Sequence, residues 1–342
     1  MEFIKKHWII ISAMGLILIA ALKITDPGSA SAAFALKLDS ILPQDRNNFD
    51  FTKTVLSLSA LVDPDTDMAW TEKEIDSMAA DLKDKIGDEG NPEKIINAFN
   101  RYFFVQEGFV FDKNFTDMDA RGGEISLEDL RNFHSIEKTL KRKKGICLSM
   151  SLIYLMLGDK LRLPLYGVLI PGHIYVRYKE PGRTGINIET TVSGAEYYGY
   201  RDSIALLDHS KTAYGRELDK YSVVAAYLSN IGNYFITTGQ NRKAEVMFKK
   251  SLEMLPDSAE AYLNMGILCE TEKNNPAAVE NYEHTLELLP ESGFAHYRLG
   301  AIYLSEQRFT KAQEQLEEAV LEKAGGDDAV KLLNKAKNKD GF

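Results

Sequence analysis

The sequence predicts an α+β body followed by an all-α array of repeated helix pairs. Apolar residues recur at helical spacing in several blocks between residues 36 and 145, and the spacing changes to the two-residue alternation of strands between residues 165 and 191. From about residue 225 similar residues return every 34 positions, which is the period of a two-helix repeat. These three observations predict two structural units in one chain.

Composition excludes several classes of protein. Of the 342 residues 44% are hydrophobic, which supplies enough apolar side chains for ordinary cores, so disordered and fibrous classes are excluded. The formal net charge of −9 leaves no basic field that would attract nucleic acid. Cys147 and Cys269 lie in segments of different character, so no disulfide scaffold is expected, and the six histidines are scattered without metal-site spacing. We therefore expect no metal or other cofactor.

Residues 1–33 are expected to be a signal peptide or an N-terminal anchor. Lys5 and Lys6 precede an apolar run over residues 8–22, and Ala30-Ser31-Ala32 fits the small-x-small rule of a cleavage site. Such a run spans about 22 Å as a helix, short of the roughly 30 Å of a bilayer core, which favours cleavage. The long spacer before the cut site favours the alternative, an uncleaved anchor that attaches the protein to the membrane through residues 8–22. Both alternatives export the body to the periplasm or another extracytoplasmic space.

Residues 34–140 are expected to form a helical lead-in. Helical periodicity covers residues 51–62, 71–86 and 92–105, and turn signals rich in proline, aspartate and glycine separate these blocks. The following domain, residues 141–220, is expected to carry the chemistry.

In that domain Gly145 begins an apolar helix that has Cys147 in its first turn. A thiolate there lies at the positive end of the helix dipole beside unpaired N–H groups, and both lower the pKa of a thiol. The basic run over residues 141–144 would act in the same direction, the alternative being an ordinary solvated face. We expect Cys147 to be a nucleophile, against the alternative of a buried core cysteine.

Three strands follow, over residues 165–170, 171–178 and 186–191, with a Pro- and Gly-rich turn between the last two. A hairpin centred near residue 181 pairs positions whose numbers add to about 362, which places His173 and Glu189 side by side on one face. The carboxylate can then hold the imidazole. Asn187 lies on the same face and would take this part after a one-pair change of register.

The helix of Cys147 is expected to pack over that face of the sheet, because this buries its apolar side chains. Thiol, imidazole and carboxylate then converge as the nucleophile, base and orienting group of covalent acyl transfer. The backbone N–H of Cys147 would supply the oxyanion hole, with Asn132 or Gln106 as a candidate side-chain donor. The alternative for His173 is a packed or surface histidine.

Residues 225–323 are expected to form three tetratricopeptide repeats. Small residues recur where two antiparallel helices cross, larger side chains fill the space behind them, and prolines end the second helix of the first two repeats. The columns are Gly232, Gly266 and Gly300; Ala244, Ala278 and Ala312; Phe248, Tyr282 and Leu316; and Pro256 and Pro290.

Cys269 falls in a packing column of this array and is expected to be unreactive. Residues 324–342 form a tail in which residues 327–337 are expected to be a capping helix. Repeats of this kind usually present a concave groove, so we expect a protein or peptide partner; the alternative is a purely structural extension of the core.

These motifs resemble the transglutaminase-like superfamily, in its bacterial branch with a helical lead-in. The resemblance rests on Gly145-x-Cys147, on Pro171-Gly172-His173, on the strand ending at Glu189, and on residues 106–109 and 131–132, and covers about residues 45–200. It implies a papain-like α+β fold with Cys147 as nucleophile, His173 as base and Glu189 as its partner. The family most often has Asp in the third place, and Glu189 is one methylene longer.

Two functions remain open from the sequence. In the first, an exported cysteine enzyme attacks an amide carbonyl, forms a thioester on Cys147 and passes the acyl group to water or an amine, while the repeats bind a protein or peptide. In the second, the core is catalytically silent and the chain is an adaptor in an envelope complex.

Overall fold

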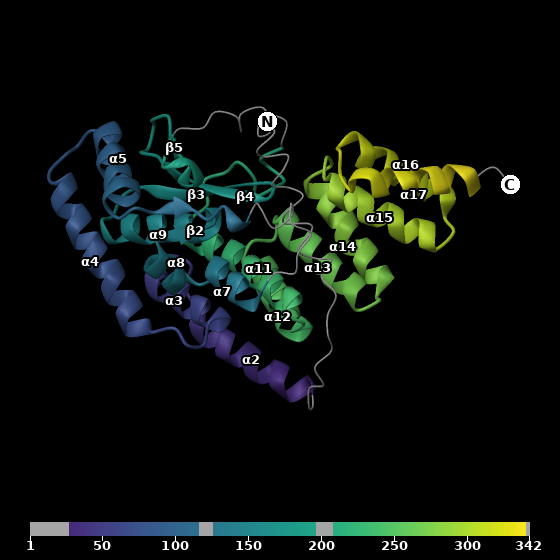
Figure 1. Ribbon diagram of the computed structural model, residues 1–342, viewed down its shortest axis with the longest axis horizontal. Coiled ribbons are helices and arrows are strands. Elements are labelled where there is room, and N and C mark those ends of the chain that lie inside the picture. The colour runs from purple at the N-terminus through teal and green to yellow at the C-terminus, as the bar shows by residue number, and fades with distance from the viewer. Residues whose placement is uncertain (1–26, 116–125, 196–207, 340–342) are drawn as a thin grey trace.

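The computed structural model describes residues 27–115, 126–195 and 208–339. Figure 1 shows helices of the lead-in at one end of the molecule, a small sheet lying over α9 (Cys147–Lys160) in the middle, and paired helices running from there to the C-terminus. The arrangement is the predicted α+β body with an all-α array attached.

The lead-in consists of helices that begin at capping side chains. Its elements are α2 (Pro27–Ile41), α3 (Phe51–Val62), α4 (Met68–Ile86), α5 (Pro92–Asn100) and the π-helix η2 (Arg101–Gln106). Asp50, Asp67 and Asn91 each accept a hydrogen bond from the backbone N–H three residues on, which satisfies a donor that α3, α4 or α5 would otherwise leave unpaired. The three predicted helical blocks are confirmed, with a change of helix type at residue 101 in the last.

The predicted leader lies mostly outside the described residues. This holds for the apolar run over residues 8–22, whereas Ala30-Ser31-Ala32 belongs to α2. Just beyond the predicted cut site, Leu38 is fully buried and the Phe34 ring meets that of Phe235 edge-on, with 5.6 Å between centroids. Among the described helices none is long and apolar enough to cross a bilayer.

The chain reaches the centre of the molecule through two short helices and a short parallel strand pair. These are α7 (Leu127–His134), α8 (Ile136–Arg142), β1 (Val110–Phe111) and β2 (Lys144–Gly145). Helix α9 follows directly, and its residues 148–158 are all buried. A helix that is covered on every side needs no single apolar face, which explains why its apolar residues are continuous in sequence.

The sheet is antiparallel, in the order β3 (Leu165–Ile170), β4 (His173–Tyr178), β5 (Ile186–Ile188). Ile170 pairs with His173, so only Pro171 and Gly172 form the turn between β3 and β4. Gly172 has a φ of +68°, a value that glycine adopts without strain and that follows proline in a type II turn. The first strand position of β4 is therefore His173.

The predicted register of the second hairpin is wrong by one pair. Val176 pairs with Ile188 and Tyr178 with Ile186, so paired numbers add to 364 instead of 362. The loop between these strands is centred on residue 182, whereas the prediction was a centre near residue 181. A shift of the centre by one residue changes the sum of the paired residue numbers by two. The third strand is also shorter than predicted, because the chain turns after Ile188 into the 3-10 helix η3 (Thr190–Val192).

The C-terminal array has the predicted helix pairs. They are α11 (Lys220–Thr237) with α12 (Asn241–Met254), α13 (Ala259–Thr271) with α14 (Asn275–Leu288), and α15 (Gly293–Ser305) with α16 (Phe309–Leu321); α17 (Gly326–Lys339) follows as the predicted cap. An added Cβ at Gly232 would lie 2.4 Å from the Phe248 ring, and one at Gly266 would lie 2.5 Å from the Tyr282 ring. Only glycine allows the helices of each pair this approach.

Helix α11 belongs to the body as much as to the array. The Tyr227 hydroxyl donates a hydrogen bond to the backbone oxygen of His134, and that of Tyr234 donates one to the backbone oxygen of Val62. One continuous apolar core joins the lead-in, the sheet and the array. The predicted array boundary at residue 225 falls within this helix.

Candidate active site

Cys147 is the first residue of α9 and remains partly accessible. The backbone just before it is held by the β1–β2 pairing, in which Phe111 lies opposite Gly145. A Cβ at Gly145 would lie 2.6 Å from Ser149 Oγ and 2.7 Å from Thr139 Cγ2, so this position requires glycine. The glycine therefore lets the chain enter the helix at the point that exposes the thiol.

The start of α9 leaves backbone donors near the sulfur. Ser149 Oγ accepts a hydrogen bond from the Ile146 N–H at 3.1 Å, whereas the N–H of Cys147 lies in the first turn, where no intrahelical acceptor exists. Asn132 is half-buried on α7, and Gln106 is exposed at the end of η2. No hydrogen bond joins either of them to Cys147 among the described residues.

His173 and Glu189 are bonded to each other. Their Nε2 and Oε2 atoms are 2.6 Å apart, and the side chains are only 12% and 3% exposed. The second carboxylate oxygen of Glu189 accepts hydrogen bonds from the backbone N–H and the hydroxyl of Thr191, at 2.8 and 2.6 Å. The carboxylate is thereby fixed on both oxygens, and it holds the imidazole in one orientation.

Asn187 does not take this place. It pairs with Arg177 across the hairpin, and its Oδ1 accepts a hydrogen bond from Arg177 Nε at 2.8 Å. Arg177 also donates to the Tyr175 hydroxyl at 2.8 Å and to Glu217 at 2.7 Å. The alternative in which Asn187 orients the imidazole is therefore excluded by its own partners.

The Cys147 side chain acts on the same imidazole. Burial alone would lower the pKa of His173, but the charges of Glu189 and Cys147 and the hydrogen bonds that the ring makes with both side chains outweigh burial and raise this pKa to about 10. Because Glu189 occupies Nε2, Nδ1 is the ring nitrogen left for the thiol. The three side chains of the predicted site thus lie together, with the imidazole ring between a carboxylate and a sulfur.

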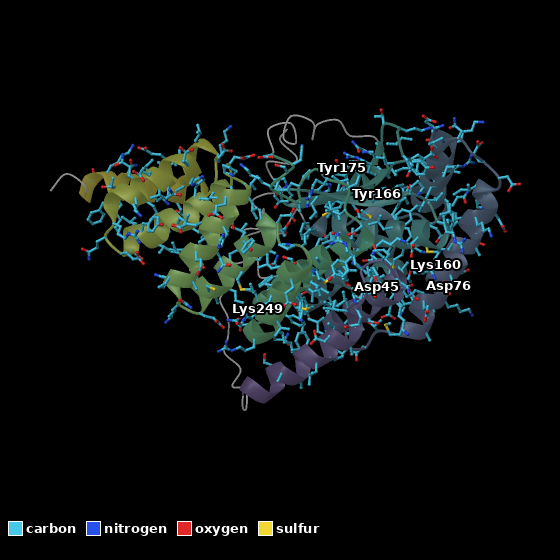
Figure 2. All side chains as sticks on the ribbon, turned by 180° about the vertical axis from the view of Figure 1, so that it is seen from behind. Asp45, Asp76, Lys160, Tyr166, Tyr175 and Lys249 are labelled. Carbon is cyan, nitrogen blue, oxygen red and sulfur yellow. The ribbon has the colours of Figure 1, made fainter. Side chains whose placement is uncertain are left out.

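The basic run before Cys147 has other partners. Lys141, Arg142 and Lys143 form ion pairs at 2.5, 2.6 and 2.7 Å with Glu137, Asp112 and Glu107 respectively. These three side chains are thus engaged by nearby carboxylates, and their influence on the sulfur stays a prediction. The other end of α9 is fixed in the same way, by Lys160 beside Asp76, as Figure 2 shows.

Cys269 lies partly buried in the array, and burial raises the pKa of its thiol. Among the residues that the structure describes, no cluster of histidine, cysteine and acidic side chains could hold a metal ion.

Sequence reasoning missed two supporting residues, Thr191 and Arg177. Thr191 donates a hydrogen bond to Glu189 from only two residues away. A threonine close after the end of a strand was the feature of the sequence that could have indicated it. Arg177 anchors β5 through Asn187, a pairing that the correct register would have predicted.

Comparison with known proteins identifies the domain that contains these three residues. Residues 69–220 match the family model of the transglutaminase-like superfamily, and residues 295–324 match that of a tetratricopeptide repeat. The chain thus contains a transglutaminase-like domain followed by a tetratricopeptide repeat, in the order that the motifs predict.

Two individual proteins are similar to this chain over different extents. A UPF0162 protein of Vibrio cholerae serotype O1 (strain ATCC 39315 / El Tor Inaba N16961) is 26% identical over 132 residues, which are 39% of this chain and 44% of that protein. The chain therefore matches less than half the length of this relative. Among solved structures, menin, whose crystal structure reveals the binding site for Mixed Lineage Leukemia (MLL) protein, has a TM-score of 0.55 at 12% identity, covering 86% of this chain and 70% of menin. At this identity the likeness concerns the fold alone.

Proposed function

We propose that this protein is an exported cysteine enzyme that hydrolyses or transfers amide acyl groups through a thioester on Cys147, and that its repeat array binds a protein or peptide. The observation that carries the proposal is the 2.6 Å bond between His173 and Glu189, on a ring that also bonds the Cys147 side chain. The export part rests on the predicted leader in residues 1–33.

The reaction would proceed in two halves. His173 holds the thiol proton, the Cys147 sulfur attacks the amide carbonyl, and the oxygen of the tetrahedral intermediate takes the negative charge beside the Cys147 N–H. As the C–N bond breaks, His173 gives its proton to the leaving amine, and a thioester remains. Water or a second amine then attacks the thioester, its proton passes to His173, and the thiolate leaves.

Glu189 contributes by stabilising the imidazolium that exists between these transfers. The same geometry serves water and an amine equally, so hydrolysis and acyl transfer both fit it. The choice would depend on what reaches the thioester first.

A silent adaptor is the second candidate. It is favoured by the repeat array, because repeats of this kind commonly bind proteins, and by the fold shared with menin, whose structure is described as containing a binding site for another protein. The two candidate functions differ in the reactivity that they predict for the Cys147 thiol.

We expect iodoacetamide at pH 6 to alkylate Cys147 at least about tenfold faster than Cys269, because the His173 ring bonds the Cys147 side chain, whereas burial raises the pKa of the Cys269 thiol. His173→Ala should slow the labelling of Cys147 by about tenfold or more. Mass spectrometry of the two cysteine peptides measures both rates in the full chain.

His284→Ala is the matched control, since this half-exposed histidine of α14 pairs with Glu287 and lies against the Tyr262 ring of the array. It should leave both rates unchanged. Equal, slow labelling of the two cysteines in the native protein would reject the enzyme and support the adaptor.

A further inference from the structure

A pocket lies where the body meets the second repeat. It encloses about 460 Å³, part of which is open to solvent, and is bounded on one side by the turn that precedes His173 and on the other by helices of the array. Its lining includes Gly172, Tyr214, Glu260, Leu263, Asn264, Ile267, Leu289, Ser292 and Phe294. The pocket therefore connects the element that carries the imidazole with the predicted binding surface of the repeats.

Most of this lining is apolar, but one carboxyl group stands in it without a partner. Glu260 lies in the first turn of α13, and neither a hydrogen bond nor an ion pair engages it within the described part of the chain. Burial raises its pKa to about 7, since the surrounding protein disfavours the charged form. The side chain keeps some solvent exposure, so a cation that enters the pocket can reach the carboxylate and pair with it.

Two further polar side chains in the lining have an oxygen that could accept a hydrogen bond from a ligand. Ser292 is fully buried at the start of α15, and its Oγ neither caps that helix nor bonds any other described atom. Asn264 donates from Nδ2 to Ser229 at 3.1 Å, which leaves its Oδ1 as an acceptor without a donor among the described residues. Native proteins rarely leave a buried polar atom such as Ser292 Oγ unsatisfied, so this atom indicates a ligand that bonds it within the pocket.

The charge of the surrounding repeat has the matching sign. Residues 257–291 contain eight acidic side chains and one basic side chain, a formal net charge of −7, and two of the eight, Asp257 and Glu270, pair with Arg216 and Arg298. A repeat of this charge attracts cationic peptides and repels acidic ones.

We propose that this pocket binds the lysine side chain of a peptide or protein substrate, with the ammonium group at Glu260, Ser292 and Asn264 and the methylene stem along Leu263 and Phe294. The inference rests on the proposed function, because it names the substrate class that the repeats would bring to the thiol. Lysine fits better than arginine, since its compact ammonium carries three donors for three separate acceptors, whereas a guanidinium is planar and rigid.

The test compares two peptides that differ only at the ammonium group. N-acetyl-Ala-Ala-Lys-Ala-Ala-amide and its norleucine counterpart are titrated by calorimetry at pH 8 into the full chain carrying Cys147→Ala, so that no acyl transfer takes place. We expect the lysine peptide to bind at least about tenfold more tightly, and Glu260→Gln to remove this preference.

Glu280→Gln is the matched control, because it removes one exposed carboxylate from α14 of the same repeat without touching the pocket. It should keep the preference. Equal affinity for the two peptides in the Cys147→Ala protein without a pocket substitution would overturn the proposal. This comparison does not require any pocket variant to fold. The calorimetry is done without Cys147, so a negative result there counts against the lysine pocket alone. A negative alkylation result counts against the cysteine enzyme.

Discussion

Glu189 reaches His173 across a diagonal of the hairpin. Continuing the observed register places Glu189 opposite Tyr175, two positions along from His173 on the same face. Diagonal neighbours lie roughly 7–8 Å apart, farther than directly opposed residues, and a longer side chain is needed to span this separation. The extra methylene that distinguishes Glu189 from the aspartate usual in the superfamily thus fits the register of this sheet.

Shortening this side chain should therefore uncouple the pair. We expect Glu189→Asp to lose the bond to Nε2, to lower the pKa of His173 from about 10 toward the ordinary value of about 6.5, and to slow alkylation of Cys147 at pH 6. Glu189→Gln should lower the same pKa while keeping the reach. Proton NMR of the ring follows the titration, and an unchanged titration in Glu189→Asp would contradict the diagonal geometry.

The same pair should also affect stability in a defined pH range. A histidine whose pKa is raised on folding stabilises the native state fully below its unfolded pKa of about 6.5, and the effect is lost as the pH rises through about 10. The loss of unfolding free energy caused by Glu189→Gln should accordingly be larger at pH 6 than at pH 9.5. Urea denaturation at the two pH values measures it, and a loss that grows with pH would show that the pair is not charged as described.

At the scale of elements, the helix pairs of the array depend on contacts between glycine and a ring. The Tyr282 ring lies where a side chain on residue 266 would be, and its hydroxyl donates to Glu270 at 2.8 Å, so the ring has little freedom to move away. The spacing of these columns was visible in the sequence because each repeat has the same contact between a glycine and a large side chain of the paired helix.

We expect Gly266→Ala to lower the free energy of unfolding by about 1–3 kcal/mol through overpacking, in spite of the better helix propensity of alanine. Gly90→Ala serves as the control, because no atom lies within 4 Å of its added Cβ, and should change stability by less than about 0.5 kcal/mol. Equal effects of the two substitutions in urea denaturation would mean that the close approach of α13 and α14 is not needed.

At the scale of the whole molecule, α11 makes the body and the array one cooperative structure. Its residues Tyr227 and Tyr234 close hydrogen bonds to the lead-in, and Ile231 is fully buried in the shared core. Figure 1 shows this helix in the middle of the molecule, between the sheet and the later repeats. A cut within α11 would remove part of the body.

Two truncations separate these parts. Deleting residues 225–342 should abolish folding, whereas deleting residues 291–342 removes α15, α16 and α17 and should leave the reaction of Cys147 with iodoacetamide within about twofold of the full chain. The second truncation also removes Ser292 and Phe294, so it should weaken binding of the lysine peptide. Circular dichroism and the labelling rate are the measurements, and a folded, reactive chain ending at residue 224 would refute the shared core.

The sequence by itself determined the features that depend on local spacing: the helices of the lead-in, Cys147 at a helix start after Gly145, the Pro171-Gly172 turn before His173, and the repeat columns. Short-range sterics and capping decide these features, so residue types at fixed offsets were sufficient to predict them. Only the tertiary structure decided which residue orients His173, which carboxylates pair with the basic run at residues 141–143, how α11 enters the body, and where Glu260 stands without a partner. Each of these depends on competition among groups far apart in the chain, and the partner of His173 also depends on a loop whose centre sets the register of the hairpin. Spacing along the sequence does not encode the outcome of that competition.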